Sequence, residues 1–248
     1  MRYSEFLRGV ITTAEKDVKI YYKKPPVIIF GLLFPFLMFL AFYIGRKVEL
    51  SLFFPGFLAM TLFFTSSSVG PLVTPWERQA GTYERLLSYP VNIKAVLMGD
   101  ILAGSVFGIA ISSVVLVGSL FFINMQIVNV GMLLASILMG AVAFSSLGVL
   151  ISAPATTSPS SIMMLSSLIR FPLIFISGIF IPLSQMKGVI KYMSYISPLT
   201  YLVDSFHSGI GGKNVLPTGI GILALLIFSG LFLLLAIKIH KRNMVKGL

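Results

Sequence analysis

Few side chains in this sequence of 248 residues are equipped for chemistry, and their types exclude several reactions. The absence of cysteine excludes disulfides, thiolate metal sites and thiol nucleophiles. The two histidines, His207 and His240, belong to no metal-binding or catalytic motif. The one Gly-Lys pair, Gly212-Lys213, is followed by Asn214 where a phosphate-binding loop needs Ser or Thr. We therefore expect no catalytic residue, metal site or cofactor on this chain.

The charged segment 74–95 has the residue types of a protein-docking surface. Glu77 and Glu84 are seven residues apart, which places them on one side of a helix. Arg78 and Arg85 repeat that spacing on another side. A segment that only set membrane topology would need Lys and Arg alone, because acidic residues contribute little to that rule. Paired acidic and basic stripes therefore favour a surface that docks a protein partner over a solvated loop.

The same segment carries signals for the ends of a helix. Thr74, with Glu77 three residues later, fits a capping box, and Pro75 suits the first helical position. Gly81 weakens such a helix by about 1 kcal/mol relative to Ala. Pro90 closes the segment. These signals predict a short helix that begins at Thr74 and lies against the rest of the protein.

The composition of the chain is that of a membrane protein. Hydrophobic residues make up 56% of it and charged residues only 11%, whereas soluble domains have about 25% charged residues. A soluble globule of this size could not hide so much apolar surface. The net charge of +11 lies between and beyond the apolar runs, which indicates membrane topology and attraction to anionic lipids, and no nucleic-acid binding.

Six runs with almost no charge reach the length of about 20 residues that a helix needs to cross a bilayer. They are 27–45, 50–75, 101–130, 130–153, 160–182 and 215–237. Lipid forbids unpaired backbone groups, and a barrel would show short alternating segments, so continuous runs predict helices. We therefore predict an all-α integral membrane protein, with six transmembrane helices in a single domain, 1–248.

The distribution of Lys and Arg predicts the orientation. Six spans place both termini on one side, with thirteen Lys and Arg, and leave five on the other. The richer side is the cytoplasmic one. The chain is therefore expected to be a multi-pass protein of the plasma membrane with both termini in the cytoplasm.

Two segments outside the spans also have helical periodicity. In residues 1–24 the apolar positions share one arc and the basic residues lie opposite, which predicts a cytoplasmic interfacial helix over a plain basic segment. The arc comprises Tyr3, Phe6, Leu7, Val10, Ile11, Ala14, Val18 and Tyr21. The segment 184–216 is too interrupted to span, and it predicts short external or re-entrant helices.

Arg170 lies about ten residues into the fifth predicted span. An arginine at that depth costs at least about 2.5 kcal/mol, so it should face protein or a watery cavity. Two interpretations are open: it lines a substrate path and attracts an anionic head group, or it pairs with a carboxylate or with carbonyls freed before Pro172. Asp100, near the cytoplasmic end of the third span, is predicted to be an interfacial charge.

Small residues recur at every fourth position within the third and fourth spans. The first series is Gly104, Gly108 and Ser112, and the second is Ser136 and Gly140. Small faces of this kind let helices approach closely, so we predict that both series are packing seams.

Three segments, in order along the chain, resemble the permeases of the ABC type-2 transporter family. The first is ERQAGTYERLL at 77–87, followed by YPV at 89–91. The second is FPLIFISGIFIPL at 171–183, and the third is SPLTYLVD at 197–204. With six predicted spans and an N-terminal interfacial helix, the resemblance covers nearly the whole chain.

The resemblance implies the membrane subunit of an ATP-driven exporter. Two permeases, identical or paralogous, would pack in the lipid with two separate nucleotide-binding ATPase subunits, which hold the ATP and Mg²⁺. Segment 74–95 would be the coupling helix that enters a groove of the ATPase. Its contact residues would be Glu77, Arg78, Gly81, Thr82, Glu84 and Arg85. Pro198, Asp204 and His207 would belong to the external segment after the fifth span, where many family members have Arg in place of His207.

Two other functions stay open at the level of sequence. A stand-alone ion-coupled carrier or channel would need several buried ionisable groups, and Arg170 is the one clear candidate. A scaffold protein would show no substrate-stimulated ATP hydrolysis in its complex. No residue pattern identifies the cargo, and one sequence does not separate a homodimer from a heterodimer.

Overall fold

The computed structural model describes residues 3–22, 24–29, 33–45, 50–88, 92–123, 127–156, 158–212, 214–217 and 219–245. Within these ranges the regular structure is entirely helical. The predicted all-α class is therefore confirmed, as expected for a chain whose backbone must satisfy its own hydrogen bonds in lipid.

Five helices in the described part of the chain are long and apolar enough to cross a membrane. They are α4 (Leu50–Gln79), α6 (Ile93–Phe122), α7 (Val130–Ile151), α8 (Pro159–Ile176) and α11 (Ile220–Val245). They coincide with the second to sixth predicted spans, so the protein crosses the membrane several times. Helix α6 begins eight residues before the predicted span, because Asn92 caps it by accepting a hydrogen bond from the Lys94 amide at 3.0 Å.

The first predicted span falls on two shorter helices, α2 (Pro25–Ile28) and α3 (Phe34–Gly45). Residues 30–32, between them, lie outside the described residues. The count of six spans therefore stays a prediction.

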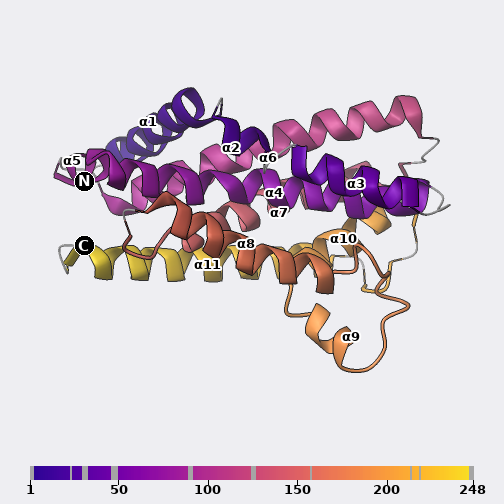
Figure 1. Ribbon diagram of the computed structural model, residues 1–248. Helices are drawn as coiled ribbons and strands as arrows, with labels where there is room; N and C mark the ends of the chain where they lie inside the picture. Colours follow the sequence, from indigo (N-terminus) through magenta and orange to yellow (C-terminus); the bar gives the residue numbers. More distant parts are fainter. Residues whose placement is uncertain are drawn as a thin grey trace.

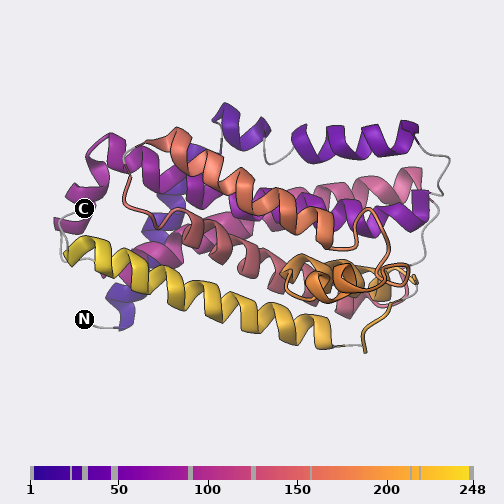
Figure 2. The same ribbon diagram turned by 60° about the horizontal axis from the view of Figure 1, so that its bottom comes forward.

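The long helices run side by side in one bundle (Figures 1 and 2). The start of α1 (Tyr3–Tyr21), the short α5 (Thr82–Ser88) and the end of α11 lie at one end of it. Two helices of the predicted external segment, α9 (Val189–Ser194) and α10 (Pro198–Gly209), lie toward the other end. An even number of spans requires this placement of the termini at a common end.

Helix α4 occupies the centre of the bundle, where it packs against α6, α7, α8 and α10. Its most apolar stretch is buried along its whole length, whereas only 17% of the corresponding stretch of α11 is buried. Phe63 of α4 illustrates the packing: its ring lies edge-on to Phe144 of α7, with the centroids 4.9 Å apart. Helix α4 is therefore a protein-enclosed core helix, and α11 presents an apolar face suited to lipid.

Four hydroxyl side chains of α4, those of Thr61, Thr65, Ser67 and Ser68, are satisfied within the helix itself, whereas the buried hydroxyls of Ser66 and Thr74 have no partner among the described residues. Thr65 Oγ1 donates to the Thr61 carbonyl at 2.7 Å, and Ser67 Oγ donates to the Phe63 carbonyl at 2.5 Å. Bonding of this kind to the preceding turn lets Ser and Thr enter an apolar interior without leaving a polar group unpaired.

Small residues let the central helices touch. The predicted seam of α6 is confirmed, since Gly104 and Gly108 both face Ser66 of α4. A second contact, which periodicity did not indicate, joins α4 to α7: a Cβ atom at Gly70 would lie 2.5 Å from the carbonyl carbon of Gly148. The backbones of α4 and α7 therefore meet without side chains between them.

Replacement of Gly70 by Ala is expected to lower the midpoint of thermal unfolding in detergent, because the added methyl group would collide with the α7 backbone. Overpacking of this kind costs about 1 to 3 kcal/mol. Gly118→Ala is the matched control, since nothing lies within 4 Å of a Cβ atom there. Equal midpoints for the two variants would contradict the backbone contact.

Helix α1 forms as predicted, but the residues of the predicted apolar arc do not share one environment, because some are buried against the bundle and others are exposed. Val10 and Ala14 are buried against the bundle, together with the polar Thr13 and Asp17. Other members of the arc, such as Ile11 at 59% exposure, face outward. The helix packs along α6 and touches α4. Its location at the membrane surface stays a prediction.

The expected helix start at Thr74 is wrong. Helix α4 continues through Pro71 and Pro75 to Gln79, and the chain breaks at Gly81, where φ is +67°. A proline inside a helix removes one donor, and such interruptions are tolerated in membrane helices when neighbouring groups satisfy the freed carbonyl. Helix α5 then begins at Thr82.

Candidate functional site

The turn between α4 and α5 projects from the end of the bundle that also holds the start of α1 and the end of α11 (Figure 1). Gly81 makes the turn because its positive φ is costly for any residue with a Cβ atom. Open space surrounds it, so backbone conformation is the reason for glycine here. The Gly81 amide donates to the Arg78 carbonyl at 3.0 Å, and Thr82 Oγ1 donates to the Glu77 carbonyl at 3.2 Å.

The six predicted contact residues separate into two groups. Thr82 and Arg85 are exposed and Gly81 is half-buried. With the exposed Gln79 and Ala80 they form a surface that we call the α4–α5 tip. Glu77 and Arg78 are each only 7% exposed and point into the protein. The side chain of Glu84 lies outside the described residues.

Glu77 belongs to a group of four ionisable side chains, three of them buried and Lys16 half-buried, which we call the ion cluster. Lys16 of α1 forms an ion pair with Glu77 of α4, and its Nζ lies 3.2 Å from Oδ1 of Asp17. Asp100 of α6 lies close enough to Asp17 for the two carboxyls to interact. The cluster therefore joins α1, α4 and α6 at the base of the α4–α5 tip.

Asp100 was expected to be an interfacial charge, and the structure contradicts this, because only 2% of the residue is exposed. Its position at the end of a predicted span gave no sign that α1 would cover it. Asp17, which interacts with Asp100, and Thr13, which packs against the neighbouring Gly99, are polar residues and so did not signal a buried face.

The surroundings of the cluster alter the protonation of its members on α1. Burial raises the pKa of Asp17, and the nearby ammonium of Lys16 offsets this only in part. Burial opposes the charge of Lys16, but Asp17, Asp100 and Glu77 outweigh that effect and raise its pKa. Lys16 therefore stays charged, and Asp17 takes up a proton more readily than an exposed aspartate.

Arg78 ties the other side of the turn to α7 and α11. Its Nη1 donates to the Pro154 carbonyl, which follows α7, and its guanidinium lies 5.0 Å from the centre of the Tyr83 ring. The Tyr83 hydroxyl lies 3.2 Å from Nδ1 of His240 on α11. Burial raises the pKa of Tyr83 to about 12, so the phenol is neutral, and the tautomer of His240 sets which of the two groups donates. The α4–α5 tip is thus held from two directions.

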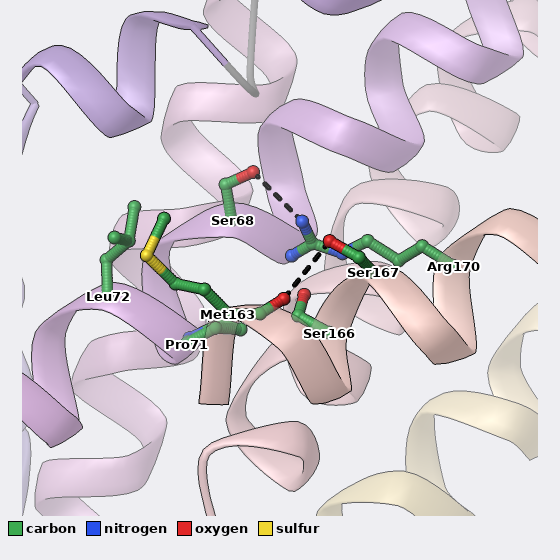
Figure 3. Close-up of a pocket in the computed structure, with 7 residues that line it drawn as sticks. All are labelled: Ser68, Pro71, Leu72, Met163, Ser166, Ser167 and Arg170. Carbon is green, nitrogen blue, oxygen red and sulfur yellow. Dashed lines mark hydrogen bonds between the residues drawn. The ribbon is translucent and has the colours of Figure 1, made fainter. Parts of the chain in front are cut away.

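Arg170 lies inside the bundle on α8 and reaches across to α4 (Figure 3). Its Nη2 donates to the backbone carbonyl of Ser67, and its Nη1 lies 3.5 Å from Ser68 Oγ. In an uninterrupted helix the Ser67 carbonyl would accept a bond from residue 71, which here is Pro71 and has no N–H. Arg170 therefore supplies the donor that the proline lacks.

This contact is of the kind that one interpretation of Arg170 expected, but it serves a different carbonyl. The freed group lies before Pro71 on α4, and not before Pro172 on α8. Arg170 also lines a pocket between the two helices, so the other interpretation remains open. The pocket is lined by Ser68, Pro71, Leu72, Met163, Ser166, Ser167 and Arg170 (Figure 3).

The three predicted residues of the external segment lie together on α10. Pro198 occupies the first turn of the helix. Asp204 accepts hydrogen bonds from the Val215 and Leu216 amides at 2.7 and 3.1 Å, which holds the loop that leads to α11. Burial lowers the pKa of His207, with a smaller opposing effect from Asp204. Asp204 and His207 line a second pocket.

Comparison with known proteins decides the family. A family model described as ABC-2 type transporter matches residues 9–210. The chain belongs to the ABC-2 type transporter family. Curated relatives of this ABC-2 type chain include the inner membrane transport permease YadH of Escherichia coli (strain K12) and of Shigella flexneri, each 27% identical over 148 residues. The match covers 59% of this chain and 57% of each relative, which is little more than half of their length.

The family match spans most of the features described above. It begins within α1, includes all four residues of the ion cluster and Arg170, and ends at Ile210, directly after α10. The resemblance that the three sequence segments indicated is therefore confirmed for this ABC-2 type protein. The roles of the individual residues stay predictions.

A double-mutant cycle is expected to reveal the bond between α1 and α4 in this ABC-2 type protein. Lys16→Met and Glu77→Gln should each lower the free energy of unfolding by about 1 to 3 kcal/mol, because the first leaves the buried Glu77 without its cation and the second removes one of the two carboxylates that contact Lys16. The double variant should lose less than the sum of the two. Denaturant unfolding in detergent measures all three values.

The exposed pair Lys19–Glu15, on the same helix, is the matched control for this cycle. Its side chains are 70% and 60% exposed, so its coupling should be negligible. Strictly additive losses at Lys16 and Glu77 would show that their ion pair does not hold α1.

Docking of α1 is expected to strengthen as the pH falls through the raised pKa of Asp17. The raised pKa of Asp17 means that the docked state binds a proton more tightly than the undocked one, so stability is lost as the pH rises through the higher pKa. Lys16, Glu77 and Asp100 face the same carboxyl. Amide hydrogen exchange along α1, corrected for the intrinsic effect of pH, measures the change.

Two substitutions of a carboxyl on α1 test the cause. Asp17→Asn should reduce the pH response, and the part that persists belongs to the carboxyls of Glu77 and Asp100 that face Asp17. Glu15→Gln should keep it, because Glu15 is exposed and its pKa is lowered by Lys19. An unchanged response in Asp17→Asn would assign the effect to another group.

Proposed function

We propose that this ABC-2 type protein is the permease subunit of an ATP-driven exporter, which forms the substrate path and couples to a separate nucleotide-binding ATPase subunit. The observation that carries the proposal is the α4–α5 tip. Its exposed residues project from one end of the bundle, while the adjacent Glu77 and Arg78 are anchored inside. A surface of this kind can receive a displacement from a partner and pass it to the helices behind it. ATP and Mg²⁺ would be bound by the partner.

The anchoring suggests different roles for the six predicted contact residues. Gly81, Thr82, Glu84 and Arg85 would meet the ATPase. Glu77 and Arg78 would transmit the movement, since their side chains bond to Lys16 and to the Pro154 carbonyl inside the permease. An ion pair that is buried and part of a cluster is better suited to hold a rigid connection than an exposed pair.

One helix would carry the movement to the substrate path. Helix α4 ends at the tip, and Ser68, Pro71 and Leu72 of the same helix line the pocket beside Arg170. Ten residues separate Pro71 from Gly81, a distance of about 15 Å along a helix. A shift of the tip would therefore displace one wall of the pocket.

The assembly would contain a second permease, identical or paralogous. The outer face of α8 is apolar, with Met164 at 75% and Leu168 at 67% exposure. Such a face can contact lipid or a second permease across the substrate path. The complex would lie in the plasma membrane with both termini in the cytoplasm, as the Lys and Arg distribution predicts and as the names of the curated inner membrane relatives suggest.

Site-specific crosslinking tests the coupling proposal. Because the chain has no native cysteine, an introduced cysteine is the one thiol on it that can react. Thr82→Cys places a thiol on the exposed tip. In native membranes, a bifunctional thiol and amine crosslinker should join it to a protein that carries a phosphate-binding loop, identified by mass spectrometry. Lys187→Cys, exposed in the segment before α9, is the control and should give no such product.

The ion cluster is the one observation that favours the stand-alone ion-coupled carrier. It adds buried carboxyls, at Asp17 and Asp100, which the sequence did not reveal. Transport by the purified chain in liposomes, driven by an ion gradient without any ATPase and lost in Asp100→Asn, would support this alternative. If neither Thr82→Cys nor Arg85→Cys is crosslinked to an ATPase, the exporter proposal fails.

A further inference from the structure

The pocket between α4 and α8 contains a buried positive charge without a negative partner. Arg170 is 5% exposed. None of the seven residues that line the pocket is acidic, and no carboxylate among the described residues forms a salt bridge with Arg170. An unpaired charge in an apolar interior is costly unless something brings a counter-charge to it. Among the described residues the guanidinium of Arg170 therefore has no counter-ion, and its neighbours are the Ser67 carbonyl and the ring of Phe64, whose centre lies 5.9 Å away.

Two donors that face this pocket are unused. Nε of Arg170 and Oγ of Ser166 are both buried and have no hydrogen-bond partner among the described residues. The other guanidinium nitrogens already bond to Ser67 and Ser68, and the Ser167 hydroxyl donates to the Met163 carbonyl at 3.1 Å. Buried polar groups are nearly always satisfied. Nε and Oγ are therefore the free donors for an acceptor that enters the pocket.

The rest of the pocket is apolar. Pro71, Leu72 and Met163 form its walls together with the serines (Figure 3). Met163 and Leu72 also belong to one hydrophobic cluster. A small hydrated anion would lose its water here and gain no apolar contact, whereas an anionic group attached to an apolar body would satisfy both kinds of wall.

The depth of the site separates transport from ordinary lipid contact. Arg170 lies eleven residues after Pro159, where α8 begins, which is about 17 Å along the helix. The head group of a bilayer lipid stays at the membrane surface, whereas the hydrocarbon core is about 30 Å thick. An anionic head group bound by Arg170 would therefore lie near the middle of the membrane, where a molecule is found only while it crosses.

From these observations we propose that Arg170 and Ser166 bind the head group of the exported substrate, and that this substrate is a lipid-like amphiphile with one anionic head group. This proposal rests on the exporter function proposed above and names its substrate class. The Nε of Arg170 and the hydroxyl of Ser166 donate to the anion, and the guanidinium supplies the counter-charge. Leu72 and Met163 contact the first part of the apolar body.

Dodecyl phosphate is the probe, titrated against the purified chain in a non-ionic detergent. Binding is measured by equilibrium dialysis with labelled probe and, independently, by the rise in the midpoint of thermal unfolding. Wild-type protein should bind dodecyl phosphate, and it should not bind inorganic phosphate, a neutral dodecyl glycoside or dodecyl trimethylammonium. Equal binding of inorganic phosphate would assign the site to a free anion, and equal binding of the neutral glycoside would assign it to detergent; either result overturns the proposal.

Two adjacent serines provide matched variants. Ser166→Ala removes the unused hydroxyl and should weaken binding at least about tenfold, because hydrogen bonds to charged groups are among the stronger ones. Ser167→Ala removes a hydroxyl that already has a partner inside α8, and it should leave the affinity within about twofold of wild type. Equal affinities of the two variants would show that dodecyl phosphate binds elsewhere, for example at the basic surface.

Arg170→Lys keeps a positive charge but removes Nε, and it should bind at least about tenfold more weakly. If this variant fails to fold, its lowered unfolding midpoint will show it, and the comparison of Ser166→Ala with Ser167→Ala then tests the proposal.

The Thr82→Cys crosslink is measured in a separate experiment. A crosslink without dodecyl phosphate binding would refute only the substrate class, and binding without a crosslink would refute only the coupling to an ATPase.

Discussion

The structure depends on one constraint: α4 is surrounded by protein on every side within a membrane, so every polar group on it must find a partner inside the chain. The hydroxyls of Thr61, Thr65, Ser67 and Ser68 meet this demand by bonding to the preceding turn, whereas those of Ser66 and Thr74 have no partner among the described residues. The carbonyl that Pro71 leaves free has no such local partner. Arg170 reaches from α8 to satisfy it, and in doing so it brings a positive charge to a depth where charge is rare.

The same constraint explains why the two candidate functional regions are linked. At one end of α4, Glu77 and Arg78 are buried because Lys16 and the Pro154 carbonyl provide their partners. The exposed tip begins just beyond them. Toward the middle of the helix, the proline-freed carbonyl positions Arg170 beside a pocket. Helix α4 therefore joins a surface suited to a partner and a site suited to a ligand in one continuous element.

The parts of the fold that depend on composition could be predicted from the sequence, and those that depend on tertiary contacts could not. Long apolar runs gave five helices at nearly the predicted places, and Gly104 and Gly108 gave a packing seam. The capping signal at Thr74 was misleading, because α4 continues through Pro75 to Gln79 and the Thr74 hydroxyl has no partner among the described residues. The burial of Asp100 could not be predicted from the sequence, because it depends on the packing of α1 against α6. The unused donor on Ser166 likewise appears only when α4 and α8 are placed together.

The contact between Gly70 and Gly148 limits how this permease can move. Helices slide past one another when a layer of side chains between them can change rotamer, and α4 and α7 have no such layer where these glycines meet. With Gly104 of α6 against Ser66 as well, these three helices would behave as a rigid block. Any opening of the path would then be a movement of this block, which includes α4 and its tip, relative to α8. The bond from Arg170 to the Ser67 carbonyl joins α8 to the block, so it would have to break and re-form in each cycle.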